Sequence, residues 1–198
     1  MGVVDSTNRM PSYMNDVEKY GTGGESLFLS IENEKITNKG YKVFDVTKDL
    51  DYQYADVDFV ISMDGNIDSL PDFETVLNGK SFIKVEVKVD TRAIDTGNLP
   101  YECISHKSLG WSVITKSDFV YMILCDEHDG ELIAKSVMWI DMNKWHDFVK
   151  NRRIEKKVNY IRNEAIVDLL CKINDMRNYK VIISERSINQ NITVNGNN

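Results

Sequence analysis

The sequence predicts an α/β or α+β domain with a central mixed β-sheet of about five strands and helices packed against it. Three features indicate this class. Short stretches in the first half of the chain alternate apolar and polar residues, as half-buried strands do. Residues 119–125 are almost continuously apolar, which is typical of a strand covered on both faces. Apolar residues recur at helical spacing near the end of the chain.

The first half of the domain is expected to run from a helix into three strands. The helix begins at about Glu18 or Glu25 and ends at Asn38, because Gly40 follows as a stop signal. The strands are expected at residues 41–47, 55–63 and 81–90. In the second strand, apolar side chains share the face opposite two acids: Val57, Phe59, Ile61 and Met63 against Asp56 and Asp58.

A hairpin and two closing helices are expected in the second half. Residues 117–126 and 131–141 form the hairpin across the tight turn "EHDG". Residues 142–153 form the first closing helix. Residues 158–175 form the second, because apolar residues there repeat every three or four positions. The segment between the third strand and the hairpin shows no regular pattern.

The chain has the size of one globular domain. Its 198 residues are 42% hydrophobic, which is enough apolar material for a substantial core. We place the domain at residues 16–185 and expect flexible, polar ends at 1–15 and 186–198. Neither a stretch long enough to cross a membrane nor a secretory signal is recognisable, so the sequence predicts a cytoplasmic protein with no membrane partner.

The cysteines and histidines do not indicate a metal or disulfide framework. Cys103, Cys125 and Cys171 are odd in number and far apart, so reduced and mostly buried thiols are expected. The histidines have no spacing typical of a metal site and are interpreted as surface or hydrogen-bonded residues: His106, His128 and His146.

Charge is spread unevenly along the chain. The formal net charge is −7, but residues 144–180 contain ten Lys and Arg against five Asp and Glu. This is a local net charge of +5, which leaves −12 for the remainder. Phosphate contacts through Lys156 and Lys157 are one interpretation of this basic segment, and a simply solvated basic face is the other.

The third expected strand, "FIKVEVKVD", poses the central functional question. Successive side chains of a strand point to opposite faces, so its apolar and charged residues separate completely. One face carries Ile83, Val85, Val87 and Val89, and the other carries Phe82, Lys84, Glu86, Lys88 and Asp90. Alternating charges of this kind are common on the water-facing side of an antiparallel sheet, but they can also carry a site.

A metal site would form if the second and third strands are neighbours. Asp58 and Glu86 then stand on one face, and two carboxylates this close resist joint ionisation unless a cation lies between them. Oxygen ligands of this kind suit Mg²⁺ or Mn²⁺, with the Val87 carbonyl and waters completing the shell. Lys88 would orient or deprotonate an attacking water, or neutralise charge on a phosphate.

These residues, in this order, resemble the PD-(D/E)xK nuclease superfamily, the restriction-endonuclease-like fold that includes Holliday junction resolvases and many phage nucleases. Its pattern is an opening helix with a Glu, an Asp on the second strand and (D/E)xK on the third. Here these are Glu25 in "GGESLFLS", Asp58 in "QYADVDFVI", and Glu86 with Lys88 in "VEVKVD". The stretch "TGNLPYECISHKSLGWSVITKSDFVYMIL" is similar to a segment of phage-type members and offers Glu102 as a further acid.

The resemblance covers about residues 18–140 and implies a nuclease that uses Mg²⁺ or Mn²⁺ to cut DNA in a bacterial or phage-infected cell. Asp58 and Glu86 would hold the ion, Lys88 would assist the nucleophile, and Glu25 or Glu102 would be an accessory ligand. No small-molecule cofactor is implied, and a homodimer would let such an enzyme cut two strands. Lys107 and Lys116 are further candidate phosphate contacts.

Other conspicuous residues have structural interpretations. Trp111 follows Gly110, and it either packs at that turn or stacks on a base. Two other residues, Trp139 and Trp145, are expected to anchor the last hairpin strand to the helix that follows. Asp45 and Asp56 are interpreted as surface acids.

Two functions therefore compete. The first is a metal-dependent phosphodiesterase that acts on DNA through a metal-activated water. The second is a catalytically inactive protein of the same fold that binds a protein partner, as an inhibitor or assembly factor, for which the strongly acidic remainder of the chain is suited. The intact set of two acids and a lysine favours the enzyme.

Overall fold

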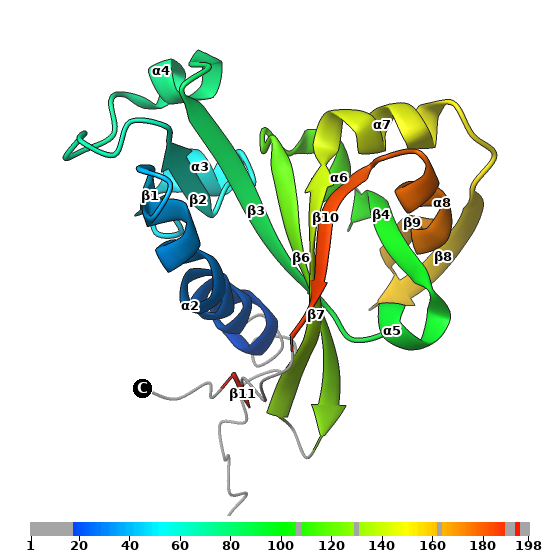
Figure 1. Ribbon diagram of the computed structural model, residues 1–198. Coiled ribbons are helices and arrows are strands. Elements are labelled where there is room, and N and C mark those ends of the chain that lie inside the picture. Colours follow the sequence, from blue (N-terminus) through cyan, green and yellow to red (C-terminus); the bar gives the residue numbers. More distant parts are fainter. Residues whose placement is uncertain (1–17, 106–107, 129–130, 162–163, 189–192, 195–198) are drawn as a thin grey trace, which may run out of the picture.

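The computed structural model describes residues 18–105, 108–128, 131–161, 164–188 and 193–194. The expected fold class is confirmed: a mixed central sheet with strand order β1-β2-β3-β6-β7-β10 is flanked by helices (Figure 1). It is mixed because β3 and β6 run parallel, whereas the other neighbouring pairs are antiparallel.

The expected helix and three strands of the first half are confirmed. A short π-helical turn, η1 (Glu18–Thr22), leads into α2 (Gly23–Thr37). Gly40 follows in the left-handed conformation, with φ of 78°, which ends the helix and turns the chain. The strands are β1 (Lys42–Asp45), β2 (Phe59–Ser62) and β3 (Phe82–Asp90), and two short helices, α3 (Leu50–Tyr54) and α4 (Phe73–Asn78), lie between them.

The expected hairpin and the first closing helix are also confirmed. The strands β6 (Phe119–His128) and β7 (Glu131–Asp141) pair along their length. Helix α7 (Met142–Lys150) begins directly after β7, and the Asp141 side chain accepts a hydrogen bond from the backbone N–H of Lys144 as its N-cap.

The prediction of a second closing helix was wrong. Residues 158–175 belong mostly to a hairpin of β8 (Glu155–Ile161) and β9 (Glu164–Lys172), and only a short helix, α8 (Ile173–Asn178), follows. Leu169 and Cys171 face the core while Asp168 and Leu170 line a groove on the other face, so the true period is two. Because apolar residues occur on both faces of β9, the sequence mimics a helical repeat.

The unpatterned middle segment supplies the partner for this hairpin. It contains α5 (Ala93–Thr96), β4 (Asn98–Ser105), β5 (Ser108–Leu109) and α6 (Trp111–Ile114). Strand β4 pairs with β9, which gives a second, antiparallel sheet of order β5-β4-β9-β8. The described strands thus exceed the expected five because a whole second sheet is present.

The expected flexible end at 186–198 was also partly wrong. Strand β10 (Ile182–Ser187) pairs with β7 along its length, with an irregularity between Ile182 and Ser184, and β11 (Thr193–Val194) pairs with β7 further along. The backbone groups of β7 therefore draw this segment into the central sheet. The expected flexible start, residues 1–15, lies outside the described residues.

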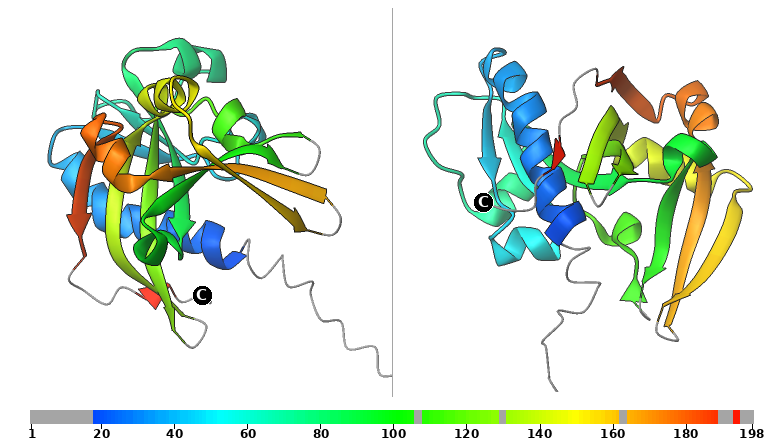
Figure 2. Two further views of the ribbon diagram at one scale, coloured as in Figure 1. Left: turned by 90° about the vertical axis from the view of Figure 1, so that its right-hand side faces the viewer. Right: turned by 90° about the horizontal axis from the view of Figure 1, so that it is seen from below.

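The central sheet is covered differently on its two faces. Helix α2 lies along one face, where Leu27 and Phe28 pack on β2, β3 and β6. The second sheet and α7 lie on the opposite side, around a core that includes Trp145 (Figures 1 and 2). Strand β2 pairs with β3 only as far as Val85, so β3 projects beyond its neighbour. In the described part of the chain, no helix is both long and apolar enough to cross a membrane.

Candidate functional site

The charged residues of β3 do not form a water-facing surface. Lys84 is 6% exposed and Glu86 is 3% exposed. The Lys84 ammonium forms an ion pair with Asp118 at 3.0 Å and donates a hydrogen bond to the Leu77 carbonyl at 3.2 Å, so it is fully paired inside the protein. The alternative of a simple wet face is therefore wrong for the middle of this strand.

Asp58 lies one residue before β2, the strand next to β3, and its backbone N–H donates to the Val85 carbonyl at 2.9 Å. Its carboxylate accepts a hydrogen bond from the Val87 N–H at 2.7 Å. Because the N–H and the carbonyl of a strand residue point to the same side, the Val87 carbonyl also faces the side of β3 on which Asp58 lies.

The Glu86 carboxylate is only partly satisfied. Its Oε1 accepts a hydrogen bond from the Lys88 ammonium. Its Oε2 is buried and has no hydrogen-bond partner among the described residues. A buried carboxylate oxygen without a partner is costly, and native proteins keep few such atoms without a functional reason. This oxygen therefore marks a place where a donor or a cation would be favourable.

The electrostatics of the pair lead to the same conclusion. Burial and the adjacent Glu86 charge raise the pKa of Asp58 to about 8, although the Val87 hydrogen bond opposes them. Burial lowers the pKa of Lys88, but the Glu86 charge and hydrogen bond, with Asp58 and Asp56, outweigh it and raise that pKa. Lys88 is therefore an ammonium at neutral pH. The raised pKa of Asp58 indicates that this one positive charge does not fully offset the negative charge of the two carboxyl groups.

Two further acids lie close to this pair. Glu25, in the first turn of α2, has a raised pKa through burial and the charges of Asp45 and Glu86, so α2 brings it to the cluster. Asp56 is half-buried, and burial together with Glu86 raises its pKa to about 6. Asp56 is thus less exposed than the surface acid that was expected. It lies in the turn before β2 with φ of 49°, so strand alternation does not apply to it.

Glu102 approaches from the second sheet, where its carboxylate has a structural task. It accepts a hydrogen bond from the backbone N–H of Trp111 at 3.3 Å, and its own N–H donates to Ser112 Oγ at 3.0 Å. Gly110 fits closely here, since an added Cβ would lie 2.7 Å from the Glu102 carbonyl carbon. The negative charge of Glu102 helps to raise the pKa of Asp56. The hydrogen bonds of Glu102 also stabilise the turn before α6.

Trp111 forms one wall of the cluster. Its ring packs against Trp145 with centroids 6.1 Å apart, and the Lys88 ammonium lies 5.0 Å from the centroid of its ring. The expected packing role is confirmed, and the cation–π contact adds a restraint on Lys88. His146 is hydrogen-bonded as expected, with its ring nitrogen 2.9 Å from the Ser112 carbonyl.

The remaining sequence expectations about tryptophans, cysteines and acids are met in part. Trp145 is fully buried and packs on the second sheet through Tyr101, whereas Trp139 packs on α2 through Phe28, so only Trp145 belongs to the helix after β7. The three cysteines are free thiols, two of them buried: Cys103, Cys125 and Cys171. Asp45 is exposed, as expected.

The candidate phosphate contacts have different positions. Lys116 is exposed on a loop whose neighbours Thr115 and Ser117 donate hydrogen bonds to the Asp56 carbonyl at 3.0 and 2.7 Å. Lys156 and Lys157 are consecutive on β8, so they point to opposite faces of the second sheet. They cannot act together as a helical patch would. Lys107 lies outside the described residues.

The oxygen donors of this cluster are of the chemical kind that divalent cations prefer. No group of three or more His, Cys, Asp or Glu side chains in the described ranges is arranged around one point to hold a metal. The fit instead depends on Asp58, the unpartnered Glu86 oxygen and the Val87 carbonyl, with water for the remaining positions. Oxygen donors of this kind are those that Mg²⁺ and Mn²⁺ prefer, and Mg²⁺ commonly keeps several waters.

Comparisons with protein-family models, curated proteins and solved structures each found no match to the chain. We therefore infer the function from the residues of the site.

Proposed function

We propose that the protein is a metal-dependent phosphodiesterase that hydrolyses DNA. The observation that carries this proposal is the pairing of half-buried Asp58 with buried Glu86, in which one Glu86 oxygen has no partner among the described residues while Lys88 stands beside the other. The order of helix, Asp and Glu-Val-Lys strand is the pattern behind the resemblance to PD-(D/E)xK nucleases, and the contribution of the Glu86 charge to the raised pKa of Glu25 supports a role for Glu25 in it.

Asp58, Glu86 and the Val87 carbonyl would hold Mg²⁺ or Mn²⁺, and Glu25 would serve as an accessory acid. Such an ion, when bound, lowers the pKa of a coordinated water and neutralises negative charge on a phosphate oxygen. Asp58 is fixed for this task because the Val87 N–H holds its carboxylate against the backbone of β3. A proton must leave Asp58 before it can act as a ligand, since its pKa is raised to about 8.

Lys88 would act as a cation. The surrounding carboxylates raise its pKa, so it donates hydrogen bonds and does not accept a proton at neutral pH. Its ammonium is held between Glu86 and the Trp111 ring. From there it can donate to a phosphate oxygen or orient an attacking water, and it offsets the charge that develops as the phosphodiester bond breaks.

One observation favours the competing function of a protein-binding module. A groove of about 600 Å³ lies on the α2 side of the central sheet, and its floor is largely apolar. Apolar side chains contributed by the sheet include Ile61, Ile83, Phe119, Val137 and Trp139. Lys35, Lys39 and Arg186 also line the groove, so an acidic amphipathic segment of a partner protein would suit it.

Activity and metal binding on matched variants test the proposal. Wild-type protein should cut plasmid or oligonucleotide DNA with Mg²⁺ or Mn²⁺ and not with EDTA. Glu86→Ala should lose cleavage and bind Mn²⁺ more weakly in calorimetry. Lys88→Met, which keeps the stem against Trp111, should lose cleavage but retain most Mn²⁺ affinity, because only the carboxylate is a direct ligand.

Control variants at exposed positions separate these effects from general damage. Glu34→Ala on α2 and Lys80→Ala before β3 should leave both cleavage and Mn²⁺ affinity unchanged. All variants should unfold cooperatively. If the wild type binds no divalent ion and cuts no nucleic acid, while Glu86→Ala only gains stability, the catalytic proposal is wrong and the protein-binding alternative stands.

A further inference from the structure

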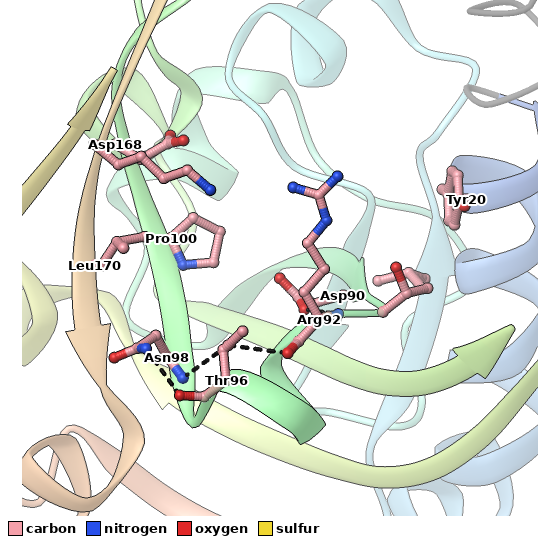
Figure 3. A pocket seen from close by; sticks show the side chains of 11 residues that line it. Tyr20, Asp90, Arg92, Thr96, Asn98, Pro100, Asp168 and Leu170 are labelled. Carbon is pink, nitrogen blue, oxygen red and sulfur yellow. Dashed lines mark hydrogen bonds between the residues drawn. The ribbon is translucent and has the colours of Figure 1, made fainter. Parts of the chain in front are cut away.

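A second groove lies between the end of β3 and the second sheet. Its volume is about 460 Å³. One side is formed by the turn after β3, including Asp90 and Arg92, and the facing side by Asn98 and Pro100 on β4 with Leu170 on β9 (Figure 3). Tyr20 on η1 stands at the far side of the opening. We call this space the β3–β4 groove.

The β3–β4 groove continues directly from the acidic cluster. On β3, Glu86 and Lys88 belong to the cluster, and Asp90 follows on the same face as the first residue of the groove. On β4, Glu102 approaches the cluster, and Pro100 precedes it with the same parity. A polymer lying along the groove would therefore reach the carboxylate pair at one end.

The charged groups that reach solvent in this groove are mainly cations. Arg92 and Lys157 are exposed, and the Arg92 guanidinium points into the open space (Figure 3). No acid among the described residues forms an ion pair with Arg92. The acids of the groove are engaged or covered: Asp90 accepts hydrogen bonds from the N–H groups of Arg92 and Ala93, and Asp168 is 9% exposed.

The remaining lining is suited to a flat ring. Tyr20 presents an aromatic side chain at one edge, while Pro100 and Leu170 present apolar surface at the other. Bases stack on aromatic and apolar side chains, and arginine also stacks on bases. The volume is that of a drug-sized ligand, which corresponds to one or two nucleotides, and stacking on this lining requires bases that are unpaired.

We propose that the β3–β4 groove binds one unpaired nucleic-acid strand next to the cleavage site, with Arg92 and Lys157 as its phosphate contacts. This inference rests on the proposed nuclease function and narrows its substrate to single strands, or to duplexes with an unpaired end. The groove guides the strand so that a phosphate arrives at Asp58 and Glu86 while the flanking base lies between Tyr20 and Pro100.

Consecutive side chains of β8 point to opposite faces of the sheet, and this provides a matched pair of variants. Lys157→Glu places a negative charge in the groove, and Lys156→Glu places the same charge on the opposite face of the same strand. Binding of a short fluorescent oligonucleotide should be measured by anisotropy in EDTA, so that no hydrolysis occurs, at several salt concentrations. Arg92→Glu is the second groove variant, and Lys80→Glu, at the other end of β3, is its control.

The single strand should bind more tightly than its duplex. Lys157→Glu and Arg92→Glu should each weaken it about tenfold, and each should reduce the slope of log affinity against log salt by about 0.7. Lys156→Glu and Lys80→Glu should leave affinity near that of wild type. Equal losses for Lys157→Glu and Lys156→Glu, no loss for either groove variant, or tighter binding of the duplex would each overturn the groove assignment.

Hydrolysis measured on the same proteins separates the two proposals. If the wild type cuts DNA and both groove variants cut it equally well, the groove assignment fails and the nuclease proposal stands. If Lys157 and Arg92 control single-strand binding but the wild type cuts no substrate with Mg²⁺ or Mn²⁺, the nuclease proposal fails and the groove remains a nucleic-acid site. If single strands neither bind nor are cut, both fail.

Discussion

Asp58→Asn should stabilise the protein in the absence of divalent ions near pH 8 and have little effect near pH 4. The pKa of Asp58 is raised from its ordinary value of 3.8 to about 8, first by burial and then by the Glu86 charge. Between these pH values the folded protein holds a proton that the unfolded chain releases. The stability contributed by the protonated acid is therefore complete below about pH 4 and is lost as the pH rises to about 8.

The size of the effect follows from the two pKa values. One pKa unit corresponds to about 1.4 kcal/mol, so a rise from 3.8 to about 8 sets an upper bound of about 5 kcal/mol near pH 8. The opposing effect of the Val87 N–H hydrogen bond is already contained in this pKa, and local relaxation and water penetration reduce the cost of a buried charge, so the gain is smaller than the bound. We expect a net gain of about 2–4 kcal/mol, or roughly 5–15 °C in melting temperature for a chain of this length.

Thermal unfolding in EDTA over a series of pH values measures this gain. The control is Asp68→Asn, whose carboxylate is exposed and should show no pH-dependent difference from wild type. Adding Mn²⁺ should then raise the melting temperature of the wild type more than that of Asp58→Asn, because the variant lacks one ligand. The reasoning would be refuted if the stability of Asp58→Asn relative to wild type did not increase between pH 4 and pH 8. It would also be refuted if Asp58→Asn were less stable than wild type at pH 8.

Two further substitutions test the surroundings of the site. Gly110→Ala should destabilise the turn before α6 by about 1–3 kcal/mol in chemical denaturation, because the new Cβ would meet the Glu102 backbone as well as its side chain; a neutral result would mean that this turn adjusts freely. Glu32→Gln should cost about 1–2 kcal/mol at neutral pH, because Glu32 accepts hydrogen bonds from Tyr121 at 2.8 Å and from Arg186; unchanged stability would show that this network contributes nothing.

Strand alternation alone determined the central part of the candidate site. In "FIKVEVKVD" the side chains must alternate, so Glu86 and Lys88 share a face whatever the rest of the fold does. The position of Asp58 at the start of the neighbouring strand could be predicted for the same reason, once β2 and β3 were expected to be neighbours. The helix, hairpin and mixed sheet followed from equally local patterns.

Tertiary structure alone decided whether that face is wet or buried. Lys84 is enclosed because Asp118, far along the chain, supplies its counter-charge, and no local pattern announces such a partner. The recruitment of Asp56 depends on Thr115 and Ser117, which brace its carbonyl from a distant loop. Sequence periodicity records the character of each side chain, whereas burial is a property of what packs against it.

The second sheet is the clearest case in which local sequence patterns were not sufficient to predict the structure. Residues 165–172 of β9 carry apolar side chains on both faces, so spacing by itself allows a helix or a strand. Pairing of β9 with β4 selects the strand, because the backbone groups of β4 need partners that only another strand can provide. Pairing of β8 with β9 places Lys157 beside Asp168, and strand alternation turns Lys156 to the opposite face, so that Lys157 lines the β3–β4 groove. The sequence determined which residues carry charge, and the long-range strand pairing determined which of them face the same space.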